Sequence, residues 1–210
     1  TADSRRTVAA FDPPAAAWRS INDDVMGGVS TGSARITDQK TLLFSGVLSL
    51  ENRGGFASIR SDAAGYQLEG AKAVVLRVRG DGRAYYLDLR SATTVAAASY
   101  RAGFTPKAGE WQEIRLPLSE FRFAAFGREL PSAPIDPAAV RSIGFTIADK
   151  KAGPFRLEVA WIKAESESTA ATPAATTSEK PAATSNDIVA TAVAAGNFKT
   201  LAKALEAAGL

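Results

Sequence analysis

The sequence predicts an all-β domain over residues 11–165, an antiparallel β-sandwich of the jelly-roll type. Short segments in which apolar and polar residues alternate recur along this stretch, and turns rich in Gly and Pro separate them. Before residue 186, no segment shows the apolar period of a convincing amphipathic helix. About 150 residues hold eight or more strands, which favours a jelly roll over a seven-stranded immunoglobulin-like sandwich.

The strands expected in the first half of the domain carry apolar residues toward the core. Residues 41–50 are strand-like and end near a turn at residues 52–55. Residues 73–79 and 84–90 alternate, and their core-facing side chains are expected to be Val74, Leu76, Val78, Tyr85, Leu87 and Leu89. Gly-Asp-Gly at residues 80–82 is the strongest hairpin signal in the chain, and it predicts that the two flanking strands pair.

The second half of the domain continues in the same way. Residues 111–118 alternate, and Pro117 indicates a strand end or an edge strand. Residues 142–148 are rich in Ile, Phe and Thr, as strands are. In the last segment, alternation predicts an inward row of Phe155, Leu157, Val159 and Trp161. Trp161 is therefore expected to be buried.

The two ends of the chain differ from this domain. Residues 1–10 are polar and are expected to form a flexible N-terminus. Residues 166–186 are almost entirely Ala, Thr, Ser, Pro, Glu and Lys, which predicts a flexible to semi-extended linker. Within residues 187–210, apolar side chains recur at helical spacing up to the last residue. We expect this segment to be the helical start of a truncated second domain.

The composition excludes several classes of chemistry. The chain has no His and no Cys, which excludes a Ser-His-Asp triad, a thiol nucleophile, a disulfide and a Cys/His zinc site. The net charge of +3 is too small for a nucleic-acid-binding surface, and no apolar run approaches the roughly 20 residues that cross a bilayer. We expect no cofactor, no nucleic-acid partner and no membrane insertion. The first residue, Thr1, indicates a processed form or a fragment.

Three polar loops that contain Gly form the candidate functional surface. They lie at residues 18–30, 52–60 and 79–85. Gly pairs in two of them indicate tight turns or the close approach of another group. The candidate binding residues are Trp18, Asn22, Asp23, Asp24, Met26, Gly27, Gly28, Ser30, Gly54, Gly55, Phe56, Arg60, Arg79, Asp81, Arg83 and Tyr85.

The acidic residues of the first loop have several interpretations. Asn22, Asp23 and Asp24 offer oxygen atoms to a cation or a sugar hydroxyl, but the Asp-x-Asp-x-Asp pattern of a calcium loop is absent. A partner-binding surface is a second possibility. The favoured interpretation is structural, with one Asp pairing with an Arg of another loop, namely Arg60, Arg79 or Arg83.

Two further features of the sequence bear on a binding surface. Met26 is the only Met, and burial beneath the Gly pair is favoured over an exposed contact with a partner. Glu110 with Glu113, or Asp23 with Asp24, are close in sequence and do not establish the separated carboxylates that glycoside hydrolysis requires. We expect no enzymatic activity.

The ordered motifs resemble those of the complex I intermediate-associated protein 30 family. They comprise Trp18 with Asn-Asp-Asp-Val-Met-Gly-Gly-Val-Ser at residues 22–30, and then residues 44–50, 54–58, 77–83, 143–145 and 153–155. The resemblance covers roughly residues 11–164. It implies a galactose-binding-like jelly roll, and the eukaryotic members of this family are mitochondrial assembly factors for respiratory complex I.

A second resemblance concerns the C-terminal segment. Residues 187–210 resemble the start of a fasciclin domain, a module of secreted and surface adhesion proteins. This fusion implies a bacterial protein that is exported from the cytoplasm. We therefore expect an extracytoplasmic location, either periplasmic or secreted.

Two hypotheses for the function follow. The first is a non-catalytic protein-binding module, similar to an assembly factor, in which replacing Asp23 and Asp24 with Ala abolishes partner capture and leaves the melting temperature nearly intact. The alternative is a carbohydrate-binding module with Trp18, Tyr85 and Trp111 on one face. A planar row of exposed aromatic residues favours a glycan, whereas an apolar patch with a charged rim favours a protein.

Overall fold

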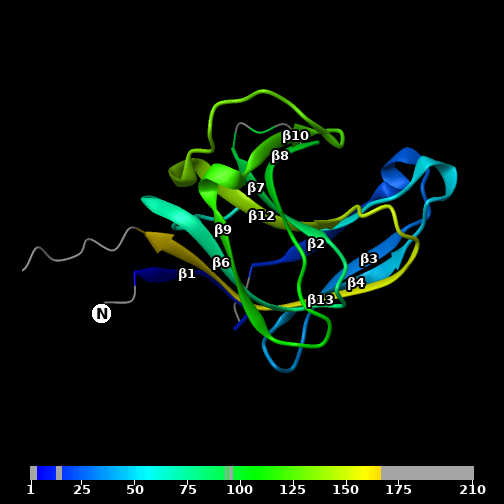
Figure 1. Ribbon diagram of the computed structural model, residues 1–210, viewed down its shortest axis with the longest axis horizontal. Helices are drawn as coiled ribbons and strands as arrows, with labels where there is room; N and C mark the ends of the chain where they lie inside the picture. Colours follow the sequence, from blue (N-terminus) through cyan, green and yellow to red (C-terminus); the bar gives the residue numbers. More distant parts are fainter. Residues whose placement is uncertain (1–3, 13–15, 93, 95–96, 167–210) are drawn as a thin grey trace, which may run out of the picture. The chain divides into compact units, whose positions relative to one another are not determined.

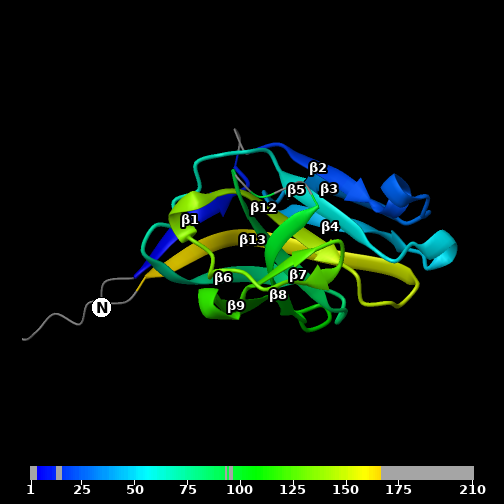
Figure 2. The same ribbon diagram turned by 90° about the horizontal axis from the view of Figure 1, so that it is seen from above.

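The computed structural model describes residues 4–12, 16–92, 94 and 97–166, and these form two antiparallel β-sheets packed face to face (Figures 1 and 2). The predicted all-β sandwich is confirmed. The first sheet has the order β3-β4-β13-β6-β9, with β1 paired to β13. Its strands are β1 (Arg5–Ala10), β3 (Thr31–Ile36), β4 (Leu42–Leu48), β6 (Ala71–Arg79), β9 (Gln112–Pro117) and β13 (Gly153–Ser166).

The second sheet has the order β11-β10-β8-β7-β12-β5-β2. Its strands are β2 (Trp18–Asn22), β5 (Ala57–Ser61), β7 (Tyr85–Ser91), β8 (Ala98–Phe104), β10 (Arg122–Ala125), β11 (Arg128–Glu129) and β12 (Val140–Ile147). Four 3-10 turns complete the described elements, namely η1 (Asp23–Met26), η2 (Glu51–Arg53), η3 (Leu118–Glu120) and η4 (Pro137–Ala139). None of these helical turns is long and apolar enough to cross a membrane.

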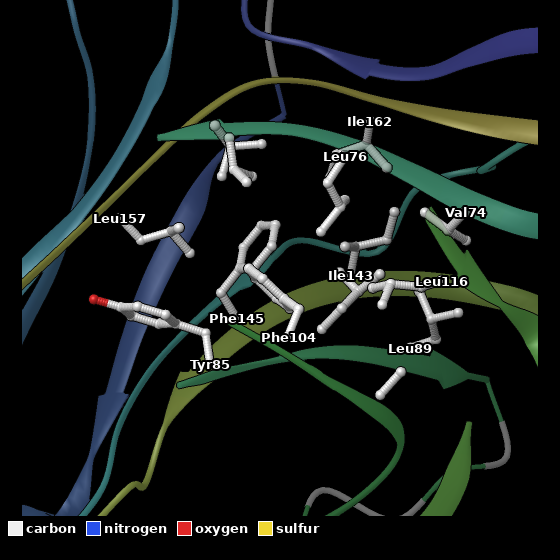
Figure 3. Close-up of a cluster of buried hydrophobic side chains, with 14 of the residues drawn as sticks. Val74, Leu76, Tyr85, Leu89, Phe104, Leu116, Ile143, Phe145, Leu157 and Ile162 are labelled. Atoms are coloured by element: carbon white, nitrogen blue, oxygen red, sulfur yellow. The ribbon is translucent and has the colours of Figure 1, made fainter. Parts of the chain in front are cut away.

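The core lies between the sheets and is built from alternate residues of each strand (Figure 3). The expected inward faces of residues 73–79 and 84–90 are confirmed, since all six predicted side chains are fully buried. Aromatic rings from both sheets meet in this core, since Phe44 of β4 contacts Tyr85 of β7 edge to face with centroids 6.4 Å apart. Burial of each such side chain stabilises the fold by roughly 1.5–3 kcal/mol.

The turn at residues 80–82 is not a hairpin, and the prediction that its flanking strands pair is wrong. β6 belongs to the first sheet and β7 to the second, so the chain crosses from one layer to the other here. The tight Gly-Asp-Gly turn serves this corner instead, and Gly80 forms a parallel bridge with Ala108. Local turn chemistry fixes where the chain bends, whereas strand pairing depends on residues far along the sequence.

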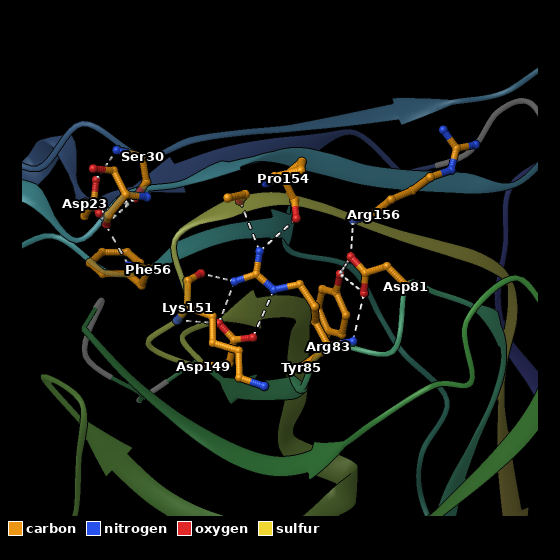
Figure 4. A network of polar contacts seen from close by, with 12 residues as sticks. Asp23, Ser30, Phe56, Asp81, Arg83, Tyr85, Asp149, Lys151, Pro154 and Arg156 are labelled. Carbon is orange, nitrogen blue, oxygen red and sulfur yellow. Dashed lines mark hydrogen bonds and ion pairs between the residues drawn. The ribbon is translucent and has the colours of Figure 1, made fainter.

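The side chain of Asp81 fastens this corner. Its carboxylate accepts the phenol O–H of Tyr85 at 2.9 Å and the backbone N–H of Arg83 at 3.0 Å. It also accepts the N–H of Arg156 on β13 at 2.7 Å (Figure 4). Tyr85 is fully buried, so its hydroxyl depends on this partner. Asp81 and Tyr85 are therefore internal ties and not ligand-facing groups.

A β-bulge in β13 changes the orientation of Trp161. The register of β13 against β6 shifts between Val159 and Trp161. The inward row is therefore Phe155, Leu157 and Val159 before the bulge, and Ile162 and Ala164 after it. Trp161 is half-buried with Lys163 over its ring at 4.6 Å, and the expectation that it is buried is wrong because one extra residue reverses the alternation.

The ends of the domain are described in part. Residues 5–10 were expected to be flexible, but they form β1 and pair with β13 from Arg5 to Ala10. Pro117 ends β9, which is an edge strand as predicted. The expected linker over residues 166–186 lies outside the described residues apart from Ser166 itself, and the expected fasciclin start over residues 187–210 lies outside them entirely.

Replacing Tyr85 with Phe is expected to lower the free energy of unfolding by about 1–2 kcal/mol, because the Asp81 carboxylate loses the hydrogen bond from the buried phenol. Urea denaturation measures this change. The matched control is Tyr86→Phe on the outward face of the same strand, which should leave stability within about 0.5 kcal/mol. Equal effects of the two variants would show that Asp81 does not fasten the corner.

Candidate functional site

The first candidate loop is organised by the buried side chain of Asp23. Its Oδ1 accepts the backbone N–H of Ser30 at 2.9 Å, and its Oδ2 accepts the Ser30 hydroxyl at 2.5 Å (Figure 4). Oδ2 also accepts the backbone N–H groups of Gly55 at 2.7 Å and Phe56 at 3.4 Å. One carboxylate thus ties the loop after β2 to the loop before β5.

The same cluster reaches the end of β4. The Ser30 hydroxyl, which donates to Asp23, accepts the backbone N–H of Ser49 at 2.9 Å. Three segments that are separate in sequence, around residues 23–30, 49 and 55–56, are therefore held by one hydrogen-bond network. Since the Asp23 side chain has no exposed surface, it is closed to a ligand in this arrangement.

Two Gly residues exist here because the backbone approaches Asp23 closely. A Cβ at Gly54 would lie 2.5 Å from Asp23 Oδ2, and a Cβ at Gly28 would overlap Asp23 Cγ. Any larger residue at either position would displace the carboxylate. The Gly pairs of the two loops thus serve the close packing of the loops on Asp23.

The ionised form of Asp23 is favoured by its surroundings. Burial alone raises the pKa of this carboxyl, but the hydrogen bonds from the Ser30 hydroxyl and from the N–H groups of Gly55, Ser30 and Phe56 outweigh it. The net effect holds the pKa of Asp23 below its usual value. The loop network is therefore built around a negative charge.

The favoured pairing of a first-loop Asp with an Arg is wrong. Asp23 accepts O–H and N–H groups, while Arg79 pairs with Glu158 at 2.8 Å. Arg83 donates to both oxygens of Asp149, at 3.0 and 2.7 Å, and to the carbonyl groups of Lys151, Gly153 and Pro154 (Figure 4). Arg79 and Arg83 are thus ties within the sandwich.

Other candidates have structural roles as well. Trp18 is half-buried at the core edge, stacked 6.0 Å from Phe145. Asn22 donates from Nδ2 to the carbonyl of Gly32 at 3.1 Å. Arg60 lies on the outward face of the second sheet, away from the loops that were expected to hold it. Among the first-loop acids, Asp24 alone is exposed.

Met26 is exposed, and the expectation that it is buried is wrong. Its exposed fraction is 61%, and that of its neighbour Val25 is 69%. Asp23 occupies the space beneath the Gly pair that Met26 was expected to fill, so η1 turns its apolar side chains outward. The C-cap Gly27 permits this tight turn, with a φ of 87°.

These side chains lie at the end of the sandwich where η1, η2, the start of β3 and the end of β4 gather (Figure 1), and three further apolar side chains are exposed on or beside the same segments. We call this group the loop-end patch, and its members are Val25, Met26, Val29, Val47 and Leu50. Exposed charged residues border it, namely Asp24, Glu51 and Arg53. An exposed apolar patch with a charged rim is typical of a protein-binding surface.

Sequence reasoning included Met26 among the candidate binding residues but expected it to be buried, and it missed the other four members of this patch. Val25 and Val29 are apolar residues in a Gly-rich polar loop, which is a signal of exposure that the sequence contains. Val47 and Leu50 could not be identified in this way, because Val47 lies on a strand and Leu50 precedes a turn. Within the described residues, no group of three or more Asp or Glu side chains is arranged to hold a metal ion.

Comparison with known proteins places this fold in a family. A family model described as complex I intermediate-associated protein 30 matches residues 9–159. The chain belongs to the complex I intermediate-associated protein 30 family. Relatives of that name include one from Mus musculus, 31% identical over 141 residues that cover 65% of this chain and 42% of the relative. A probable member from Caenorhabditis elegans is 28% identical, covering 72% and 51%.

The chain spans about half the length of these relatives. Both are named as mitochondrial proteins, and this contradicts the expected periplasmic or secreted location. A family 11 carbohydrate-binding module from Clostridium thermocellum, solved with a β-1,3-1,4-mixed-linked tetrasaccharide, has a TM-score of 0.58 at 19% identity, covering 77% of this chain and 95% of the module. This likeness shows a shared jelly-roll fold.

Replacing Asp23 with Ala is expected to lower the free energy of unfolding by about 3 kcal/mol, because several buried donors lose an ionised acceptor. Urea denaturation measures this, and Asp24→Ala is the matched control, with an expected change within about 0.5 kcal/mol. This revises the expectation that both acids can be replaced without cost. An unchanged stability of Asp23→Ala would show that the loop network does not hold the fold.

The depressed pKa of Asp23 predicts a specific pH dependence. Its contribution to stability is complete above the usual value of 3.8 and is lost as the pH falls through the lower pKa of the folded state. Between about pH 5 and pH 2, the free energy of unfolding should therefore fall more steeply in the wild type than in Asp23→Asn. Identical slopes in the two denaturation series would contradict an ionised Asp23.

Proposed function

We propose that the chain is a non-catalytic protein-binding module, similar to an assembly factor, and that its partner docks on the loop-end patch. The observation that carries this proposal is the exposure of five apolar side chains, four on loops that the buried Asp23 carboxylate holds in place and one, Val47, at the adjoining end of β4. A patch that is already ordered costs little conformational entropy on binding. Apolar side chains at its centre and charges at its rim are the usual anatomy of a protein interface.

The names of the relatives indicate what kind of protein the proposed partner is. The relatives are named as associated with complex I intermediates, so the proposed partner is a protein of a respiratory complex I assembly intermediate. The loop-end patch is the docking surface of this proposal. The polar candidate residues Asp23, Arg79 and Arg83 instead hold the loops and sheets together, and they are assigned no chemical step. The proposed role is therefore to hold a partner and not to transform it.

Replacing Val25 and Met26 with Ser should reduce partner capture at least tenfold, because about 1.4 kcal/mol of lost apolar contact corresponds to that factor. The measurement is quantitative mass spectrometry of complex I proteins captured from mitochondrial membranes by the full chain. The matched control is Phe126→Ser with Leu130→Ser, which changes an exposed apolar residue in the turn between β10 and β11 and another directly after β11.

Each outcome decides one part of the proposal. Capture by the wild type and the control, but not by the patch variant, would support it. Equal capture by all three proteins would remove the patch as the docking site. An absence of complex I proteins from the wild-type sample would remove the assembly-factor role.

The second candidate function is a carbohydrate-binding module, which the shared fold favours. The aromatic residues expected on one face are not gathered into a planar exposed row. Tyr85 is fully buried, and Trp18 packs at the core edge. Trp111 directly precedes β9 of the first sheet, and the guanidinium of Arg79 lies over its ring at 4.9 Å. Calorimetric titration with β-1,3-1,4-mixed-linked glucan tests this candidate, and saturable binding would favour it over protein docking.

A further inference from the structure

The outward face of the second sheet carries a row of Arg residues that the loop-end patch does not include. Cross-strand pairing places six residues in one line across β2, β5, β12, β7, β8 and β10. In order, the row is Arg19, Arg60, Gly144, Asp88, Arg101 and Arg122. Arg90 lies on the same face, two residues beyond Asp88.

The only acid in this row is already engaged. Asp88 has an exposed fraction of 1%, and its Oδ1 accepts the Ser99 hydroxyl at 2.6 Å and two N–H groups of Arg101 at 3.0 and 3.2 Å. Its Oδ2 accepts the Thr146 hydroxyl at 2.5 Å. At the rim, Arg19 lies 3.8 Å from Asp62. The central group of Arg60, Arg90 and Arg101 thus places three guanidinium groups around the single carboxylate of Asp88.

The central Arg side chains lie close enough for the positive charges of Arg60 and Arg101 to disfavour the protonated form of Arg90. Burial lowers the pKa of Arg90 to about 10, and while Asp88 opposes this, the positive charges of Arg60 and Arg101 add to it. Burial and the charge of Arg19 likewise lower the pKa of Arg60. Since a pKa of about 10 keeps Arg90 protonated at neutral pH, a bound anion would relieve the repulsion that Arg90 meets from Arg60 and Arg101.

The Arg side chains are also oriented by their neighbours. Arg90 donates from Nε to the carbonyl of Ala98 at 3.0 Å. The Arg101 guanidinium lies over the ring of Tyr86 at 4.9 Å, in addition to its bonds with Asp88. At the centre of the row, Gly144 adds no side chain, and a Cβ there would lie 3.3 Å from Nη1 of Arg90. The guanidinium groups are therefore held on a face with no large side chain between β5 and β7.

We propose that this face binds an extended acidic peptide segment of the partner protein, with Arg60, Arg90 and Arg101 as the carboxylate-binding residues. Arg binds carboxylates through paired N–H groups, which suits this residue type. Arg60 on β5 and Arg101 on β8 are separated by three strand spacings, or about 14 Å. In an extended peptide, side chains four residues apart on one face are about 13 Å apart.

The separation of Arg60 and Arg101 predicts which sequence pattern the bound peptide has. Acidic side chains at alternate positions of an extended peptide all point to one face. The first and third of three alternating carboxylates then reach Arg60 and Arg101, while the second lies near Arg90. The inference rests on the proposed function for the source of the peptide, a protein partner, but the charge pattern belongs to this chain alone.

The probe is a synthetic peptide in which Glu alternates with Thr, and its matched control replaces Glu with Gln. Titration into the isotope-labelled full chain, followed by NMR, should shift the backbone signals of β5, β7 and β8 with the Glu peptide alone. Binding should weaken steeply with added salt. Because this measurement uses the wild-type chain, an absence of shifts on these strands overturns the proposal without any variant.

Variants of the chain test which Arg residues bind the Glu peptide. Arg60→Gln should weaken binding of the Glu peptide about tenfold, since a charge-assisted bond is lost, and Arg60→Gln with Arg90→Gln should weaken it further. Arg35→Gln with Lys107→Gln removes the same charge from exposed positions elsewhere and should bind like the wild type. Equal weakening in this control would reduce the effect to net charge and overturn the proposal.

Two further experiments distinguish the peptide proposal from an acidic glycan site and from binding at the loop-end patch. Polygalacturonate binding to the same strands, with no binding of the Glu peptide, would make the face a site for an acidic glycan and overturn the peptide proposal. The Val25→Ser with Met26→Ser variant should bind the Glu peptide like the wild type. If the Glu peptide does not bind while the loop-end patch still captures complex I proteins, only the proposal for the row of Arg residues is overturned.

Discussion

The buried carboxylate of Asp23 is the interaction on which the arrangement of the functional end depends. Removing a charge from water is costly, and such a group is stable only where donors surround it. Here the donors come from two segments, at Ser30 and at Gly55 with Phe56, and the Ser30 hydroxyl extends the network to Ser49. The loops must therefore close on Asp23 to satisfy its charge, and closing them turns Val25, Met26 and Val29 toward solvent. The same contact that stabilises the loops thus creates the apolar surface.

Much of the fold could be predicted from the sequence because the signals are local. Alternation placed Leu76 and Leu87 in the core, and Pro117 marked an edge strand. The failures share one cause, which is that the answer lies in distant residues. The turn at residues 80–82 bends the chain as expected, but only packing decides that β6 and β7 join different sheets. The orientation of Trp161 depends on a bulge against β6, which alternation does not reveal.

In the candidate site too, some features follow from local sequence signals and others depend on residues far apart in the chain. The motifs at residues 22–30 and 54–58 were predicted to form a binding surface, but Asp23 and Ser30 within them are buried and serve the interior. Gly28 and Gly54 make room for a carboxylate, and Ser30 binds it. The surface proposed for a partner is apolar, and its five residues lie within the motif segments at residues 22–30 and 44–50. The Arg row could not be predicted at all, because its members come from six strands whose register only the structure supplies.

The most direct test of this account is amide hydrogen exchange at Ser30 and Gly55. Neither residue lies in a strand or helix, and each donates its N–H to Asp23. If Asp23 organises the loops, both amides should exchange as slowly as those of the neighbouring strands β4 and β5, because they open only when the loop network opens. Exchange at the rate of an open surface loop would show that the loops are not held, and the ordered apolar patch would lose its physical basis.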